Sequence, residues 1–507
     1  MLARVLSHGL NGIAGFPVLV EADLATGLPA YETVGLPDAA VRESKDRIRS
    51  AIKNSDLPYP VARITVNLAP AGMKKEGAIY DLPIAAALLM AAGAIPRDAA
   101  DGYAIIGELA LDGTVRPVSG VLPMVIDARS HGTRKFLIPA ENAEEAAYLG
   151  DVSVYPVTTL RELTRHLRGE ACIPPAEQRQ WDPESISYGA DFSEIKGQQG
   201  AKRAAEIAVA GGHNLLMIGT PGSGKTMLAR RIPSILPELT LEESLEITKI
   251  HSIAGATRGG GIVRERPFRA PHHGASSAAL VGGGQRALPG EISMAHLGVL
   301  FLDEMPEFKR DVLEALRQPL EDGVITVSRA AATAQYPAEF MLVAAMNPCP
   351  CGNYGSRVNP CTCTYSQIQR YRARISGPLL DRIDIHVEMP EVGYRELMSK
   401  ISGEPSAVIR GRVNAARARQ RERFKQEGIF CNAQMNTAAI KRYCTPDAAS
   451  EKLLRQAYQQ LNLSARAYQR ILKVARTIAD VEGSEAIRPE HFAEAIQYRS
   501  LDKNGQE

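Results

Sequence analysis

Hydrophobic positions follow two different periods in the first third of the chain. Residues 16–22, 64–68 and 135–138 form short apolar runs of the length and alternation typical of strands. Residues 38–54 and 80–92 repeat their apolar positions with the period of a helix instead. Strands that alternate with helices in this way predict an α/β domain.

A proline-rich stretch at residues 172–191 has no periodicity and contains the single tryptophan of the chain, so it is predicted to be a linker. After it we expect a helix over 200–210 and a buried strand over 214–218. Residues 306–321 are predicted to form a helix with one apolar face, made of Phe308, Val312, Leu313, Leu316 and Leu320.

Strand patterns fade beyond about residue 390. Helical periods follow at residues 406–427, 448–461, 464–481 and 489–498. The last part of the chain is therefore predicted to be a helical bundle or lid.

Composition narrows the class of protein. The 507 residues include 59 Lys and Arg against 57 Asp and Glu, a formal charge of +2, which excludes a polybasic protein but allows a local basic channel. His8 and Asn11 interrupt the apolar N-terminus, so no signal peptide is predicted. With seven cysteines, an odd number, these features favour a reducing, cytoplasmic location.

A glycine-rich segment lies between the strand at 214–218 and a following helix. It has P-loop spacing, in which converging backbone N–H groups hold phosphate oxygens, the lysine reaches the β- and γ-phosphates and the hydroxyl binds Mg²⁺. A chance glycine-rich turn is disfavoured by the strand before it and the helix after it. The predicted nucleotide-binding residues are Gly219, Thr220, Pro221, Gly222, Ser223, Gly224, Lys225 and Thr226.

Two carboxylates follow a second apolar run, residues 299–302. Asp303 is predicted to hold Mg²⁺ and Glu304 to orient the attacking water, the alternative being an ordinary buried strand that ends in an acidic turn. A third strand, 341–346, ends at Asn347, which either helps to position that water or simply begins a turn. Together these residues predict ATP hydrolysis.

Lys225 and Asp303 lie 78 positions apart, and the chain between them contains a segment rich in Gly, Arg and His. Its composition does not suggest core packing. We expect either a mobile functional loop or a solvated excursion, and favour the loop.

Four stretches of the chain resemble the Mg-chelatase-like branch of AAA+ ATPases. They are residues 197–214, 266–304 (RPFRAPHHGASSAALVGGG to LFLDE), 376–390 and 463–480. The whole chain resembles the ComM/YifB family. The resemblance implies an α/β fold with a three-layer αβα P-loop core at 191–395 and a helical lid at 396–507. A Lon-protease-like (ribosomal S5 domain 2-like) α/β domain would occupy 1–170, joined by a linker at 171–190.

The same resemblance implies roles for three further residues. Asn347 matches sensor 1, Arg382 the arginine finger that completes a neighbouring subunit's site, and Arg466 the sensor-2 arginine of the lid. It also implies a homo-oligomer, most simply a hexameric ring, with ATP and Mg²⁺ as cofactors. The implied activity is branch migration or helicase remodelling of DNA during homologous recombination and natural transformation. Alternatives are a chelatase-like motor for metal insertion or for remodelling a protein partner, and a scaffold whose ATPase is only an assembly switch.

The likeness to Lon proteases is clearest at residues 107–142. That protease fold needs a serine where this chain has Ile79 and Tyr80, and a lysine where it has Pro123 and Met124. The domain is therefore predicted to be a non-proteolytic module.

Two segments are candidates for DNA contact. Residues 323–328 and 334–340 predict a hairpin with Ser328 and Arg329 at its tip, suited to a phosphate backbone. The arginine-rich run 410–425 either adds positive potential or is a solvated helix with salt bridges.

Four cysteines cluster in one short stretch, namely Cys349, Cys351, Cys361 and Cys363. Four thiolates suit tetrahedral Zn²⁺, although the usual spacing has two residues between paired cysteines and here there is one. Structural zinc is favoured over free thiols and over redox chemistry. Cys172, Cys431 and Cys444 are predicted to be unrelated to the cluster.

Overall fold

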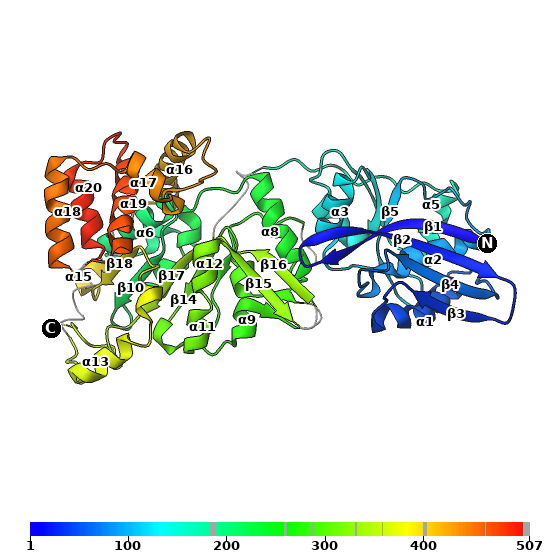
Figure 1. Ribbon diagram of the computed structural model, residues 1–507, viewed down its shortest axis with the longest axis horizontal. Helices are drawn as coiled ribbons and strands as arrows, with labels where there is room; N and C mark the ends of the chain where they lie inside the picture. The colour runs from blue at the N-terminus through cyan, green and yellow to red at the C-terminus, as the bar shows by residue number, and fades with distance from the viewer. Residues whose placement is uncertain are drawn as a thin grey trace.

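The computed structural model describes residues 1–182, 189–257, 261–284, 287–329, 332–356, 358–398, 403–461 and 463–499; the side chains of residues 329, 332, 395 and 397 are not described. The molecule is elongated, with the N-terminal sheet at one end, a second sheet in the middle and a group of helices at the other end (Figure 1). None of the described helices has the length and apolar character that a membrane crossing requires.

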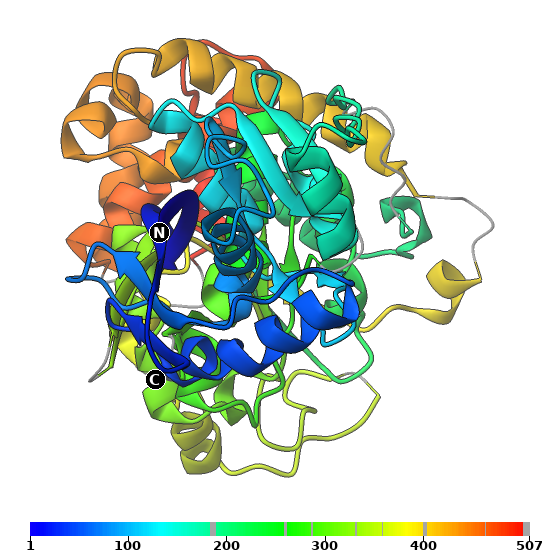
Figure 2. The ribbon, with the colours of Figure 1, turned by 90° about the vertical axis from the view of Figure 1, so that its right-hand side faces the viewer.

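The N-terminal domain is built on a mixed seven-stranded sheet with the strand order β3-β4-β2-β1-β5-β8-β9. Figure 2 shows this domain from its free end. β2 pairs antiparallel with β1 and β4, whereas β5, β8 and β9 continue the sheet in parallel. The strands are β1 (Leu2–Asn11), β2 (Ala14–Ala25), β3 (Ala30–Val34), β4 (Arg63–Ala69), β5 (Tyr103–Ile105), β8 (Lys135–Pro139) and β9 (Ser153–Val157), with a small ribbon of β6 (Glu108–Leu109) and β7 (Val115–Arg116).

The helices of this domain cover the sheet. Asp38 caps the first of them by accepting a hydrogen bond from the backbone N–H of Val41. The second is buried along its whole length, as its continuous apolar sequence requires. The helices are α1 (Ala39–Asn54), α2 (Asp81–Ala91), α3 (Val121–Ser130), α4 (Ala143–Ala146) and α5 (Leu160–Leu167).

The central domain contains a five-stranded sheet in which all strands are parallel, in the order β11-β14-β17-β10-β18. Successive residues of β10 and β17 enter different hydrophobic cores, because side chains alternate across a sheet. Both faces are covered, as parallel sheets require, so the domain has three layers. Its strands are β11 (Phe268–Arg269), β14 (Val299–Leu302), β17 (Met341–Met346), β10 (Leu215–Gly219) and β18 (Ile385–Met389).

Helices pack on both faces of this sheet and carry the inserted segments. α6 (Gln199–Gly211) packs against β18 and belongs to the same core as the C-terminal helices. The remaining helices are α7 (Lys225–Ala229), α8 (Leu241–Ile253), α9 (Ser277–Val281), α10 (Glu291–Met294), α11 (Arg310–Glu314), α12 (Arg317–Asp322), α13 (Tyr365–Arg372), α14 (Gly377–Leu380) and α15 (Tyr394–Leu397).

The glycine-rich insert contributes to a core, contrary to the prediction. Leu280, Ile292 and Ala295 are fully buried in the cluster on one face of the sheet. The strands β12 (Gly282–Gly283) and β13 (Leu288–Pro289) pair closely because Gly290 has no side chain; a Cβ there would lie 2.4 Å from the Leu280 carbonyl oxygen. The glycines therefore serve tight backbone packing in this part of the insert.

The single helix predicted over residues 306–321 is also wrong. The segment forms a short 3₁₀ turn followed by the separate helices α11 and α12. Pro319 lies in the first turn of α12, where its missing N–H costs nothing; within one continuous helix it would break the hydrogen-bond ladder. Phe308, Val312 and Leu316 are nevertheless buried together, so the apolar pattern predicted the buried face but not the break.

The part of the chain that the structure describes after β18 contains helices joined by turns and loops, and no strand. Its helices share one continuous hydrophobic core with α6, so they are packed onto the central domain. They are α16 (Ser406–Arg423), α17 (Thr437–Tyr443), α18 (Ala448–Gln460), α19 (Ala465–Glu482) and α20 (Pro489–Gln497).

Candidate nucleotide site and cysteine cluster

The P-loop connects β10 to α7 at the carboxyl edge of the central sheet. Gly222 and Gly224 have φ values of +78° and +92°, a left-handed conformation that glycine adopts without strain. Gly219 is equally constrained, because a Cβ there would lie 2.5 Å from the Met389 carbonyl oxygen. The glycines of the motif are thus required by the shape of the loop itself.

Lys225 is buried, and three oxygens surround its ammonium group. Nζ donates to the carbonyl oxygens of Gly219 (2.7 Å) and Thr220 (2.9 Å) and to Oδ1 of Asn347 (3.3 Å). Burial lowers the pKa of Lys225, whereas the negative charges of Asp303 and Glu304 act in the opposite direction. The sensor-1 candidate and the P-loop lysine are thus in direct contact.

Thr226 and Asp303 form the second contact of the site. The Thr226 hydroxyl donates to Oδ2 of Asp303 over 2.7 Å. A hydroxyl and a carboxylate are the oxygen ligands that Mg²⁺ accepts beside nucleotide phosphates, so this pair fits the ion that accompanies ATP. When bound, Mg²⁺ would neutralise charge on the phosphate oxygens.

Glu304 has a strained backbone. Its φ is +51°, a region that a residue with a side chain rarely adopts, and its N–H donates to Oδ1 of Asp303 over 3.0 Å. Its carboxylate is half exposed, with Oε2 lying 3.7 Å from Nδ1 of His273. This turn therefore points the two adjacent carboxylates in different directions: that of Asp303 toward Thr226 and that of Glu304 toward solvent.

The topology explains why these residues meet. β14, β17 and β10 are neighbours in the sheet and run parallel, so the residues that follow them lie along one edge. Asp303 follows β14, Asn347 follows β17 and the P-loop follows β10. Ligands of open parallel sheets bind at this edge.

Arg382 and Arg466 lie in a different place and share one acidic partner. Arg382 is buried, donates from Nη1 to the Pro378 carbonyl oxygen (2.6 Å) and forms an ion pair with Glu321. Arg466 is exposed, and its Nη2 lies 3.8 Å from the same Glu321 carboxylate. Among the described contacts, none joins either arginine to Lys225 or to the residues around it.

Sequence reasoning missed Glu321, which lies in α12. It also missed the hydrogen bonds that connect Arg382, one of the arginine pair Arg382 and Arg466, to the central sheet. Asn214, just before β10, donates from Nδ2 to the Arg382 carbonyl oxygen (2.9 Å) and accepts at Oδ1 from the Leu342 N–H (2.8 Å). A polar residue directly before a buried strand was the signal available for Asn214. Nothing local in the sequence connects Glu321 to arginines 61 and 145 positions away.

The arginine-rich helix α16 is used mainly for internal ion pairs and hydrogen bonds. Arg412 contacts Glu206 and Glu404, and Arg423 contacts Asp480. Arg417 and Arg419 donate to backbone carbonyl oxygens of α6 and α19. Of the two interpretations of this run, the structure favours the salt-bridged helix.

The predicted hairpin is present as β15 (Val324–Arg329) and β16 (Ala332–Pro337). Ile325, Val327 and Tyr336 face the core, whereas Thr326 and Ser328 face outward. The Arg329 side chain lies outside the described residues.

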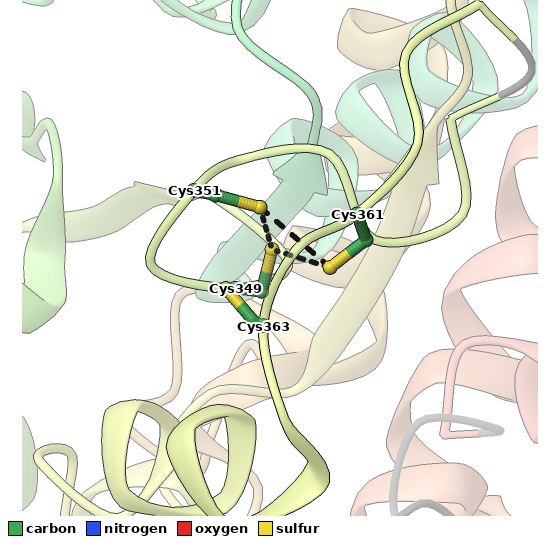
Figure 3. Close-up of side chains that lie close together, drawn as sticks. All are labelled: Cys349, Cys351, Cys361 and Cys363. Atoms are coloured by element: carbon green, nitrogen blue, oxygen red, sulfur yellow. Dashed lines mark hydrogen bonds between the residues drawn. The ribbon is translucent and has the colours of Figure 1, made fainter.

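The four cysteines converge on one point (Figure 3). Their sulfurs all lie within 4.8 Å of one another, and Cys349 Sγ is 3.4 Å from Cys351 Sγ and 3.7 Å from Cys361 Sγ. Hydrogen bonds from the N–H groups of Asn353 and Thr362 lower the pKa of the Cys351 thiol, whereas desolvation and the neighbouring thiols raise the pKa of Cys361 and of Cys363 against the effect of a backbone hydrogen bond. Cys172, Cys431 and Cys444 lie outside this cluster.

Comparison with known proteins shows the family. Profiles described as "Magnesium chelatase, subunit ChlI", "Subunit ChlI of Mg-chelatase" and "Magnesium chelatase, subunit ChlI C-terminal" match residues 191–397, 20–142 and 403–499. The chain is 44% identical over 504 residues to the uncharacterized protein YifB of Escherichia coli, and 44% identical over 508 residues to the competence protein ComM of Haemophilus influenzae. Each match covers 99% of this chain and 98% of the relative. The chain belongs to the ComM/YifB family of Mg-chelatase-like AAA+ ATPases.

Membership of the ComM/YifB family confirms the predicted resemblance and, with the two sheets, the predicted fold class. The chain is also 26% identical over 161 residues to Lon protease 2 of Bacillus subtilis, a match that covers 30% of this chain and 28% of that protein. As an AAA+ ATPase family, ComM/YifB implies ATP and Mg²⁺ as cofactors, consistent with the contacts of Lys225, Thr226 and Asp303.

Proposed function

We propose that this protein is an ATP-driven, hexameric DNA motor that promotes branch migration during homologous recombination and natural transformation. The observation that carries the proposal is 44% identity to a competence protein over 99% of the chain, together with a complete set of P-loop, Asp303 and Glu304 residues. A motor needs nucleotide hydrolysis, and in this chain each group that hydrolysis requires has a candidate.

The residues of the nucleotide site take distinct roles in this proposal. Lys225 binds the β- and γ-phosphates, and Thr226 with Asp303 holds Mg²⁺. Glu304 orients the attacking water, and Nδ1 of His273 lies 3.7 Å from its carboxylate. Asn347 links the water position to Lys225, which it already contacts.

The arginine pair supports a ring. Arg382 and Arg466 converge on one carboxylate of Glu321 and make no described contact with their own P-loop. Two guanidinium groups placed around an anion form a site for a phosphate. In a head-to-tail ring, a neighbour's γ-phosphate would replace the Glu321 carboxylate between them, and hydrolysis would then require assembly.

DNA contact is assigned to the hairpin rather than to the arginine-rich helix. The arginines of α16 with described partners are engaged inside the chain, whereas Thr326 and Ser328 of the β15–β16 hairpin are exposed to solvent. We place Arg329, at the tip of this hairpin, against a phosphate backbone in the lumen. The N-terminal domain would act as a non-proteolytic module, and the protein would work in the cytoplasm.

A chelatase-like motor that acts on a protein partner is the second candidate, since the three family profiles carry that description. A branch-migration assay on a synthetic four-way junction separates the two. Wild type should convert the junction to duplex products with ATP, and Lys225→Ala and Glu304→Gln should not. Glu307→Gln is the matched control, because Glu307 lies three positions away and pairs with Arg374 on the surface. ATP hydrolysis without junction movement by the wild type would reject the DNA motor.

A further inference from the structure

The loop that carries the four cysteines, residues 347–364, contacts the P-loop. The sequence motifs of the two loops do not predict this contact. The cysteine loop connects β17 to α13 and contains no described helix or strand. Gly352, between the cysteines, has a φ of +83°, and a Cβ there would lie 2.7 Å from Cγ of Pro221. Asn347, the partner of Lys225, is only two residues before Cys349. The loop is therefore fixed to the nucleotide site at two points.

The sulfur geometry matches a single tetrahedral ion. With Zn–S bonds of about 2.3 Å, the sulfurs of a tetrahedral site lie about 3.8 Å apart. The measured separations are 3.4 Å for Cys349–Cys351, 3.6 Å for Cys351–Cys361 and 3.7 Å for Cys349–Cys361. A disulfide would require about 2.05 Å. The spacing of one residue within each Cys-X-Cys pair is therefore no obstacle to a shared ion.

Packing alone does not account for the cluster. Three of the four cysteines are partly exposed, so hydrophobic burial is a weak reason for their convergence. The N–H of Tyr354 donates to Cys349 Sγ over 3.3 Å, a contact that orients a metal-binding sulfur. Among the described residues of the loop, the backbone–backbone hydrogen bonds are Gly352 N–H to Cys349 O (3.0 Å) and Ser356 N–H to Asn353 O (3.0 Å), whereas several other N–H groups donate to cysteine sulfurs or to Ser356 Oγ.

We propose that Cys349, Cys351, Cys361 and Cys363 bind one structural Zn²⁺, which braces the P-loop through the contact between Gly352 and Pro221. Four thiolates in tetrahedral array select Zn²⁺ or iron, and a closed set of four protein ligands is the structural type of zinc site. The ion would hold an otherwise irregular loop at a fixed distance from Lys225. The bracing part rests on nucleotide binding at the P-loop, and the metal part does not.

Metal content of the purified full-length protein tests the site directly. Elemental analysis should find about one zinc per chain. The double variant Cys351→Ser/Cys361→Ser should lose it, and Cys172→Ser, an exposed cysteine outside the cluster, should keep it. Because the double variant can fail to fold, release of zinc from the wild type on thiol modification gives a second measurement. Iron, or no metal in the wild type, would overturn the proposal.

Two glycines of the same loop test the bracing. Gly352 and Gly355 have nearly equal φ values, +83° and +82°, but a Cβ at Gly355 meets nothing within 4 Å. Gly352→Ala should weaken binding of a fluorescent ATP analogue about tenfold while zinc is retained, and Gly355→Ala should change it less than about twofold. Equal affinities in the two zinc-loaded variants would overturn the bracing. Zinc content and nucleotide binding are both measured without DNA. A failure of the DNA-motor proposal would therefore leave both measurements unchanged.

Discussion

The nucleotide group around Lys225 and the arginine pair around Glu321 are organised in opposite ways. In the first, Lys225 already contacts Asn347, and Thr226 already contacts Asp303, within the chain. In the second, two cations from distant elements converge on an acidic side chain. The first group has the lysine, hydroxyl and carboxylate that bind phosphate and Mg²⁺. The second group has two guanidinium groups that could bind an anion, but no groups that bind Mg²⁺.

In the proposed ring, this difference would let one chain carry both halves of a catalytic site without being complete by itself. In phosphoryl transfer, the P-loop lysine and an arginine finger both stabilise the negative charge that spreads over the γ-phosphate oxygens. Among the described contacts, Lys225 lies at the P-loop of its own chain, whereas neither Arg382 nor Arg466 contacts that loop. The following variants separate the two groups.

The largest effect on the arginine group is expected from Arg382→Ala. A transferred γ-phosphoryl group would lose its arginine finger, so ATP turnover should fall by about 10³-fold. ATP binding should persist, because Lys225 and Thr226 are unchanged. Steady-state hydrolysis and equilibrium binding of a fluorescent nucleotide measure the two effects. If Arg382→Ala lost nucleotide binding as well as turnover, Arg382 would belong to the nucleotide group, and the two groups would not be distinct.

A smaller effect is expected from Arg466→Ala, with Arg470→Ala as its control in the same helix. As the proposed sensor-2 arginine, Arg466 should lower turnover by about 10²-fold when it is removed. Because its side chain is exposed, its removal should change stability little. Arg470 instead pairs with the buried Asp384 over 2.8 Å and, against the effect of burial, helps to lower the pKa of that carboxyl. Its removal leaves a buried charge, at a cost of about 3 kcal/mol. Turnover assays and thermal melting should therefore give opposite orders of severity; the same order in both would contradict the assignment.

The smallest effect on turnover is expected for a contact remote from both groups, between the N-terminal domain and α8. Glu145 is buried and accepts a hydrogen bond from the Ser252 hydroxyl over 2.9 Å, and burial raises the pKa of Glu145 to about 7. Because the folded-state pKa is raised, this residue contributes full stability below pH 4.5 and loses it as pH rises through 7. The loss amounts to at most about 3 kcal/mol.

Glu145→Gln removes this ionisation. The variant should melt at a higher temperature than wild type at pH 8, and the difference should vanish below pH 4.5. Turnover per active site should stay unchanged, since neither group is touched. A pH-independent difference in melting temperature would show that Glu145 does not ionise in this range.

The sequence predicted the parts of the fold that depend on local order. The strands at 64–68 and 214–218 and the helix at 38–54 are present because their periods are intact over the whole element. The helix predicted at 306–321 is broken because Pro319 tolerates only a first-turn position. The insert is packed rather than free because glycine allows backbones to approach, a property that composition alone does not reveal.

The candidate site follows the same rule. The P-loop is contiguous in sequence, so its spacing, with the strand before it and the helix after it, identifies it. Asp303 and Asn347 were recognised because each directly follows a buried strand. Glu321, in contrast, meets Arg382 and Arg466 only through the packing of α12 against distant segments, and the contact of Gly352 with Pro221 joins two loops of separate strands. Such contacts have no local signal.

The central claim is that the two groups complete each other across a subunit boundary. It is tested most directly by measuring ATP turnover in co-purified assemblies of Lys225→Ala and Arg382→Ala chains. Each variant alone should be inactive. Random mixed rings combine an intact P-loop with an intact neighbouring arginine at about one quarter of their interfaces, so turnover should recover to about one quarter of wild type. Mixed assemblies as inactive as either variant alone would contradict the claim.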